Sequence, residues 1–199
     1  MFRRGFKSSS EETSLKIRQR LHLPPNAPVD PRAVAELLGI PIIEPGQLVE
    51  LPAEVRYRLL TTHSDEWSAI TVSFGRSHLI VVNSSHASVR TNSSLAHEIA
   101  HVILRHEPSM MYMTPRSGVT LRTHNPEQED EASWLAGCIL LPREALLHAR
   151  RIGSSDEEIC NTYGISNAML RFRLNATGVD FQMRSRARFR GGRSPSAGH

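Results

Sequence analysis

The most regular pattern of apolar and polar positions in the chain lies between Ser93 and Glu107. Its apolar residues recur at helical spacing, at positions 95, 99, 102 and 103. Asn92 or Ser93 is placed to cap the first turn. Because the residues that flank this face are mostly apolar or small, the pattern predicts a largely buried helix.

A second helical pattern runs from Asn125, which can cap it, to Pro142, which stops it. Glu129 stands on or near the apolar face of this helix, whereas Glu127 and Asp130 are better placed toward solvent. That face is formed by Ala132, Leu135, Ala136, Ile139 and Leu140.

Two runs rich in β-forming residues precede the first of these helices. They span 69–74 and 78–83, and the short Gly75-Arg76-Ser77 segment between them has the spacing of a hairpin. Residues 40–44 are a further short strand candidate. We therefore expect an α+β fold in which a small antiparallel β-sheet packs on helices.

The N-terminal part carries a weaker pattern. Residues 1–13 are polar, and we expect them to be disordered. Ser14 can cap a helix that runs to Leu23, and Asp30 can cap another with Pro31 at its first position.

The C-terminal part begins with an amphipathic helix over 144–151 and continues as a helix-turn-helix-like pair. Its two helices span 155–163 and 166–174, with Gly164 at the turn. One interpretation is a DNA-reading module with Arg171 and Arg173 facing the duplex. Three acidic residues open the first helix, where phosphate would lie, so we favour packing or partner binding.

Charge is distributed unevenly along the chain, whose net charge is +4. Eight basic residues lie beyond the outermost acids, and without them 16 basic residues face 20 acidic ones. The positive ends are expected to be mostly solvated, and the arginine-rich tail offers weak nucleic-acid contact. This tail is expected to be disordered over 181–199, and it holds Arg184, Arg186, Arg188, Arg190 and Arg193.

The two cysteines, Cys138 and Cys160, form no Cys-x-x-Cys pair and are expected to be small core residues. No apolar run approaches the length of a membrane span, and the first ten residues lack the apolar region of a signal peptide. We expect a cytoplasmic protein that does not contact a membrane.

The helix over 93–107 contains the sequence His97-Glu98-Ile99-Ala100-His101, an H-E-x-x-H pattern. Histidines four apart lie on one helix face and suit a single zinc ion. Glu98 lies beside the first of them, where its carboxylate can reach a reacting water as general base. If the helix face were exposed, the same residues would be solvated and inert, but buried His and Glu need partners.

A catalytic zinc requires a third protein ligand. The metzincin pattern, with Gly three residues and His six residues after the second His, is absent because Leu104 and Glu107 stand there. His106 is one position short, and we interpret it as a structural His or a support for a ligand.

The two helical motifs together resemble the ImmA/IrrE family of zincin-type metallopeptidases. The features that carry the resemblance are an Ala-His-Glu-x-x-His helix and, about 30 residues later, an acidic helix that ends in Leu-Leu-Pro. The resemblance as a whole covers roughly Ser14 to Gly178. The resemblance implies that Glu129 is the third zinc ligand. Ser133 stands where that family usually has Asn, so any contact that this Asn makes to support the ligands is altered here. Leu135 replaces the usual Phe.

The resemblance further implies a zinc-dependent endopeptidase whose protein substrate is a helix-turn-helix transcriptional repressor, cleaved or antagonised in mobile-element or stress-response control. The alternative is a non-catalytic, zinc-containing regulatory module that binds a protein partner or DNA through its C-terminal helices. A purely structural site has no use for Glu98, which favours the enzyme.

The long connection over 108–124 can act as a lid. Tyr112 or His124 within it can donate a hydrogen bond to a developing oxyanion. The alternative is that its methionines fill the core. The resulting organisation is a zincin-like metallopeptidase domain over 14–152 and a helical appendage over 153–180, between the two disordered ends.

Overall fold

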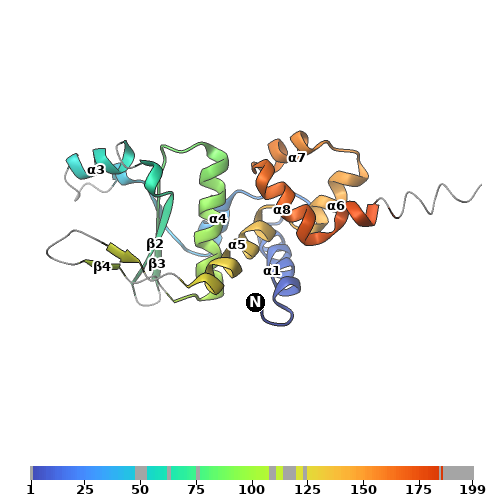
Figure 1. The fold of residues 1–199 in the computed structure, drawn as a ribbon, viewed down its shortest axis with the longest axis horizontal. Helices are drawn as coiled ribbons and strands as arrows, with labels where there is room; N and C mark the ends of the chain where they lie inside the picture. The colour runs from blue at the N-terminus through green and yellow to red at the C-terminus, as the bar shows by residue number, and fades with distance from the viewer. Residues whose placement is uncertain are drawn as a thin grey trace, which may run out of the picture.

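The computed structural model describes residues 2–47, 53–61, 64–74, 77–107, 111–113, 120–122, 125–183 and 185 (Figure 1). The helices are α1 (Phe6–Arg20), α2 (Pro31–Leu37), α3 (Ala53–Leu60), α4 (Ser88–Leu104), α5 (Pro126–Leu140), α6 (Arg143–Arg151), α7 (Asp156–Tyr163) and α8 (Asn167–Thr177). The strands are β1 (Ile42–Ile43), β2 (Ala69–Phe74), β3 (Ser77–Val82), β4 (Met111–Met113) and β5 (Thr120–Arg122), and two 3-10 turns are η1 (Pro45–Gln47) and η2 (Ser64–Glu66).

The main sheet has three strands in the order β1-β3-β2. The predicted hairpin is confirmed, because β2 and β3 pair antiparallel, with Ala69 opposite Val82. The other pairing corrects the expected antiparallel sheet, because Ile42 of β1 lies opposite Ile80 in a parallel register. A parallel neighbour requires a long crossover, and α3 and η2 lie in that crossover. The α+β class is confirmed, and β2 is left at an edge of the sheet.

Helix α4 lies between this sheet and α5 and contacts both (Figure 1). Leu95 and Ile99 on its apolar face are fully buried, as the pattern predicts. The helix begins at Ser88, earlier than expected, with Ala87 at its N-cap and no side-chain cap. Ser93 therefore lies inside the helix, where its hydroxyl donates to the carbonyl of Val89 at 3.1 Å. Because the first turn is polar and has no capping side chain, the sequence contains no local signal that the helix begins at Ser88.

Helix α5 is the most buried helix of the molecule, and its C-terminal carbonyls are satisfied by side chains from other helices. Three of these carbonyls, of Cys138, Ile139 and Leu141, accept from Ser14, Arg18 and Arg173, at 2.6, 2.9 and 2.8 Å respectively. The end of a helix leaves its last carbonyls without intrahelical partners, so a buried end needs such donors. Burial lowers the pKa of Arg18 to about 10, which still leaves the guanidinium protonated at neutral pH.

Helix α1 contradicts the expected disorder of residues 1–13, because it begins at Phe6. Ser14 is not a cap but a fully buried residue in the middle of the helix. The buried face of α1 also includes Ser10 and Arg18, so polar side chains replace the apolar ones that a periodicity search requires. The helix is stabilised by its contact with α5.

The C-terminal helices dock onto the rest of the protein. Gly164 takes a left-handed conformation at the turn, and its carbonyl accepts from Nδ2 of Asn92 on α4 at 3.4 Å. Tyr163 donates to the carbonyl of Asn26 at 2.7 Å. Arg173 is fully buried, so the interpretation in which it faces a DNA duplex is wrong.

Residues 179–183 are helical, which corrects the expected disorder at the start of the tail, whereas residues 186–199 lie outside the described part of the chain. Among the described residues, no helix combines the length and apolar character that crossing a membrane requires.

Candidate metal centre

Three candidate ligands converge between α4 and α5. Nε2 of His97 lies 3.0 Å from Oε2 of Glu129 and 3.0 Å from Nε2 of His101. Nε2 of His101 is 3.7 Å from Oε1 of the same carboxylate. The helical spacing of the histidines places them on one face of α4, and the crossing of α4 with α5 brings the carboxylate opposite them.

The geometry and chemistry of this set fit a zinc ion. Ligand atoms about 2.0–2.1 Å from a tetrahedral ion are roughly 3.3 Å from one another, and the three distances bracket that value. Two imidazoles and one carboxylate are also the ligand types that zinc takes in catalytic sites. Within the described residues, this cluster is the group that could hold a metal.

A partly buried chain of hydrogen bonds lies behind His101. Its Nδ1 is 3.0 Å from Nδ1 of His106, whose Nε2 is 3.3 Å from Oε2 of Glu131. The carboxylate only accepts, so His106 donates from Nε2 and accepts at Nδ1 from His101. This proton assignment leaves the lone pair of His101 Nε2 directed at the other two ligands. His106 thus contacts the candidate ligand His101 from behind, and Glu131 fixes the tautomer of His106.

The support for His97 is weaker. Oγ of Ser133 is 3.5 Å from Nδ1 of His97, a long contact for a hydrogen bond. A serine is shorter than the asparagine usual at this position of the resembled family, which explains why the contact is long. Ser133 still lies one turn after Glu129 on α5, on the same side as the ligands.

Glu98 lies beside the ligand set but points toward the sheet. Its side chain is 7% exposed, and its Oε2 accepts from Oγ1 of Thr71 on β2 at 2.6 Å. A charge-assisted bond of this length holds the carboxylate in one orientation. The carboxylate of Glu98 is therefore held against the edge strand β2, and Glu98 lines the same cleft as His97 and Glu129.

These residues line a cleft of about 630 Å³. Its lining comes from β2 and the segment that precedes it, from α4, from α5 and from one residue of α8. His97, Glu98 and Glu129 all face the cleft, and so does Ser133. The cleft thus runs beside the edge strand β2, which pairs with β3 along its other side.

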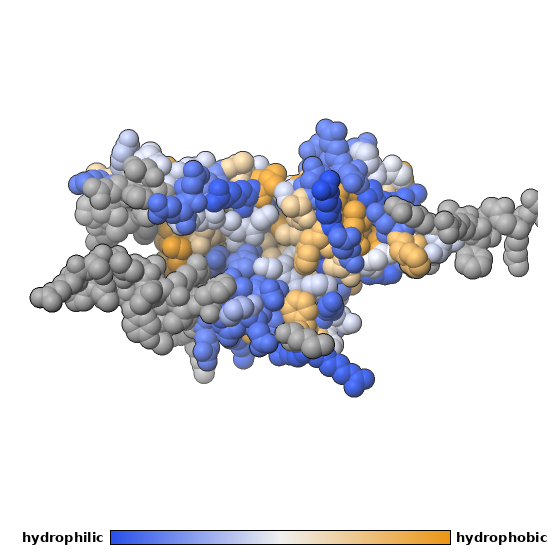
Figure 2. Space-filling model, in the orientation of Figure 1, coloured by the Kyte–Doolittle hydropathy of each residue, from blue (hydrophilic) through white to orange (hydrophobic). Residues whose placement is uncertain are grey.

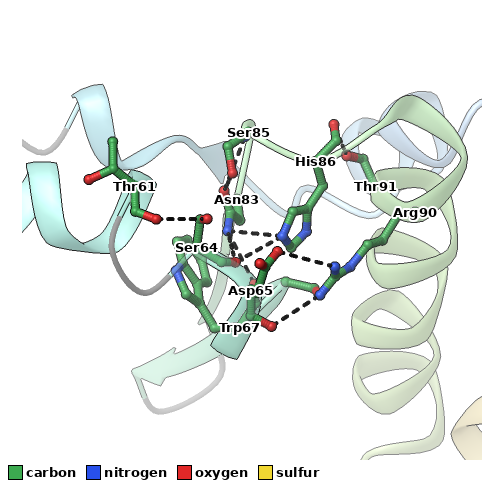
Figure 3. A network of polar contacts seen from close by, with 10 residues as sticks. Thr61, Ser64, Asp65, Trp67, Asn83, Ser85, His86, Arg90 and Thr91 are labelled. Carbon is green, nitrogen blue, oxygen red and sulfur yellow. Dashed lines mark hydrogen bonds and ion pairs between the residues drawn. The ribbon is translucent and has the colours of Figure 1, made fainter.

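The lip of the cleft is held by a polar network around Asn83 (Figure 3). The buried amide of Asn83 donates to the carbonyls of Ser64 at 2.8 Å and Trp67 at 3.1 Å. Nε of Arg90 on α4 donates to Oγ of Ser68 at 3.1 Å. The network ties the segment before β2 to the start of α4, so the cleft has a preformed lip.

The structure brings the predicted His97, His101, Glu98, Glu129 and His106 together. It does not test the two oxyanion candidates. His124 lies outside the described residues, and Tyr112 belongs to β4 but its side chain is not described.

Sequence reasoning did not identify Thr71 or Met169, which line or support the cleft. Thr71 carries one local signal, since a polar residue in the middle of an apolar strand needs a partner. Met169 has no such signal, because a methionine on an amphipathic helix is ordinarily a core residue.

Comparison with known proteins identifies one family. The family model described as Peptidase_M78, IrrE N-terminal-like domain, matches residues 49–175, which include all the candidate ligands. No curated protein and no solved structure matches the chain.

Proposed function

The chain belongs to the IrrE N-terminal-like domain family of M78 peptidases, and from this premise we propose that it is a zinc-dependent endopeptidase. The family is a metallopeptidase family, which agrees with the resemblance stated from the sequence. The observation that carries the proposal is the convergence of two histidines and a glutamate beside a fixed Glu98 in one cleft. In this proposal His97, His101 and Glu129 hold the zinc.

Each residue of the site has a separate role in the proposed hydrolysis. Bound zinc would polarise the scissile carbonyl and lower the pKa of the attacking water. Glu98 takes a proton from that water as its oxygen bonds to the carbonyl carbon, and then delivers the proton to the amine as the C–N bond breaks. Thr71 donates to the carboxylate of Glu98 and orients it.

The edge strand supplies a means of binding an extended peptide. Among the strands that the structure describes, β2 pairs with β3 on one side only, so its other backbone groups can accept a substrate strand. An antiparallel arrangement is slightly more stable per residue than a parallel one, and we infer that the substrate runs opposite to β2. Main-chain hydrogen bonds of this kind hold the scissile bond over the ligands.

The proposed substrate is a helix-turn-helix transcriptional repressor, cleaved or antagonised within the cell. The resemblance to ImmA/IrrE supports this finer proposal. The arrangement of Glu98 favours the enzyme over a non-catalytic zinc module, because a structural zinc requires no general base beside it.

The first experiment concerns the metal. Purified protein should carry about one zinc per chain, and Glu129→Ala should lose most of it because two histidines alone hold zinc weakly. Glu127→Ala, at the same helix end, is the matched control and should keep its zinc. If both variants retain zinc equally, Glu129 is not a ligand.

The second experiment concerns catalysis. Glu98→Gln keeps the shape of the side chain but removes its basicity, so the rate of peptide cleavage should fall by about 10²–10⁴. Zinc content and melting temperature, which should not change, are the controls. A variant that cleaves as fast as the parent would exclude Glu98 as the general base.

A further inference from the structure

We propose that Met169 of α8 forms the floor of a substrate side-chain pocket that selects an apolar residue on the C-terminal side of the cleaved bond. The inference rests on the proposed peptidase function and adds a specificity to it. It assigns a role to the C-terminal helix pair, in which the burial of Arg173 excludes that residue from facing a DNA duplex.

Met169 reaches the cleft because α8 packs very closely on α5. At Gly137 of α5 an added Cβ would lie 2.9 Å from Cδ of Arg173, 3.1 Å from Cε1 of Phe172 and 3.4 Å from Sδ of Met169. Only a glycine leaves room for this approach. Hydrophobic residues are also exposed at the surface over the C-terminal helices, as Figure 2 shows.

The cleft changes character from its mouth to its floor. Glu66 and Arg90 line it but are exposed, and Arg90 is engaged with Ser68, so both lie at the mouth. Ala136 is 2% exposed and Met169 is partly buried against the core, so these two lie deep.

Small side chains between mouth and floor leave space for a substrate group. The residues concerned are Ser93 and Ser94, both of which are partly buried. A thioether at the floor of such a space adapts to apolar groups of different shape and does not pair with charge.

The position of this pocket relative to the ligands indicates which side of the substrate enters it. Ser93 and Arg90 precede His97 on α4, so the cleft extends from the ligands toward the start of that helix. Ala69, at the start of β2, lines the same part, whereas Thr71, further along, contacts Glu98. A substrate antiparallel to β2 therefore runs with its C-terminal side toward Met169.

A peptide library cleaved by the full-length zinc-loaded protein and read by mass spectrometry tests the proposal. The parent should favour Leu, Met or Phe at the first or second position after the cleaved bond. Met169→Ala should shift the ratio of kcat/KM toward larger side chains by about tenfold or more, because a change of a few methylene groups in an apolar pocket has effects of this size. Met169→Lys should instead favour acidic residues there.

Met183→Ala is the matched control, since Met183 also packs on the core but does not line the cleft, and its preference should equal that of the parent. Peptides retained by zinc-loaded Glu98→Gln give a second readout that needs no turnover. An unchanged preference in both Met169 variants, or a preference confined to the N-terminal side, would overturn the inference. Absence of zinc-dependent cleavage by the parent would instead overturn the proposed function, and the peptides retained by Glu98→Gln would still report the pocket.

Discussion

Glu11 offers a sharp test of how the N-terminal helix is attached. Its carboxylate forms an ion pair with Nη2 of Arg173, which is fully buried, and its other oxygen accepts from the backbone N–H of Arg143 at 3.0 Å. Removing one partner of a buried pair leaves an uncompensated charge and costs about 3–5 kcal/mol. Because the Glu11 side chain is one-quarter exposed, we expect the lower end for Glu11→Ala, about 3 kcal/mol.

A loss of that size lowers the melting temperature by roughly 6–12 °C in a chain of this length. The measurement is thermal and urea unfolding, followed by circular dichroism. Glu12→Ala is the matched control, because the neighbouring Glu12 makes only an exposed ion pair with Lys16, and its unfolding midpoint should stay near that of the parent. If the two variants unfold together, Arg173 does not depend on Glu11, and the described attachment of α1 is wrong.

Four further predictions follow from the site and the core. Glu131→Gln, which weakens the acceptor behind the ligand histidines, should reduce zinc affinity about 10–100-fold in a chelator competition. Thr71→Val should lower kcat about tenfold with zinc content unchanged, because the carboxylate of Glu98 loses the donor that orients it. Burial raises the pKa of the Cys138 thiol to about 12, so a thiol reagent at pH 8 should label it only after unfolding. Deleting residues 186–199 should abolish most DNA retention at low salt without affecting peptidase activity; retention that persists would place the contact in the folded part.

Local sequence predicts two helix starts correctly from a capping side chain and one, at Ser14, wrongly. Asp30 and Asn125 are each expected to cap a helix, and each accepts a backbone hydrogen bond in the structure. A cap depends on residues two or three apart, so the sequence contains all of the relevant chemistry. Where Ala87 precedes α4 with no capping side chain, the same reasoning places the start too late.

Contacts between distant segments could not be predicted in this way. His97 and His101 are paired by helical spacing alone, but nothing local determines how α4 crosses α5, so the place of Glu129 depended on the family resemblance. Buried arginines are harder still. Arg18 and Arg173 look like solvent-facing residues until the unpaired carbonyls at the end of α5 lie beside them.

The contact between α1 and α5 shows that the segment with detectable family similarity is shorter than the segment that must fold together. The recognisable family segment begins at residue 49, but Phe6 and Ile17 of α1 are buried in the core and Ser14 bonds to α5. A gene fragment that starts at residue 49 would encode every candidate ligand but would lack α1. The apolar side of α5, the helix that contains Glu129, would then be exposed to water. Sequence similarity thus marks where ancestry is still detectable, and the boundary of the autonomous folding unit lies upstream of it.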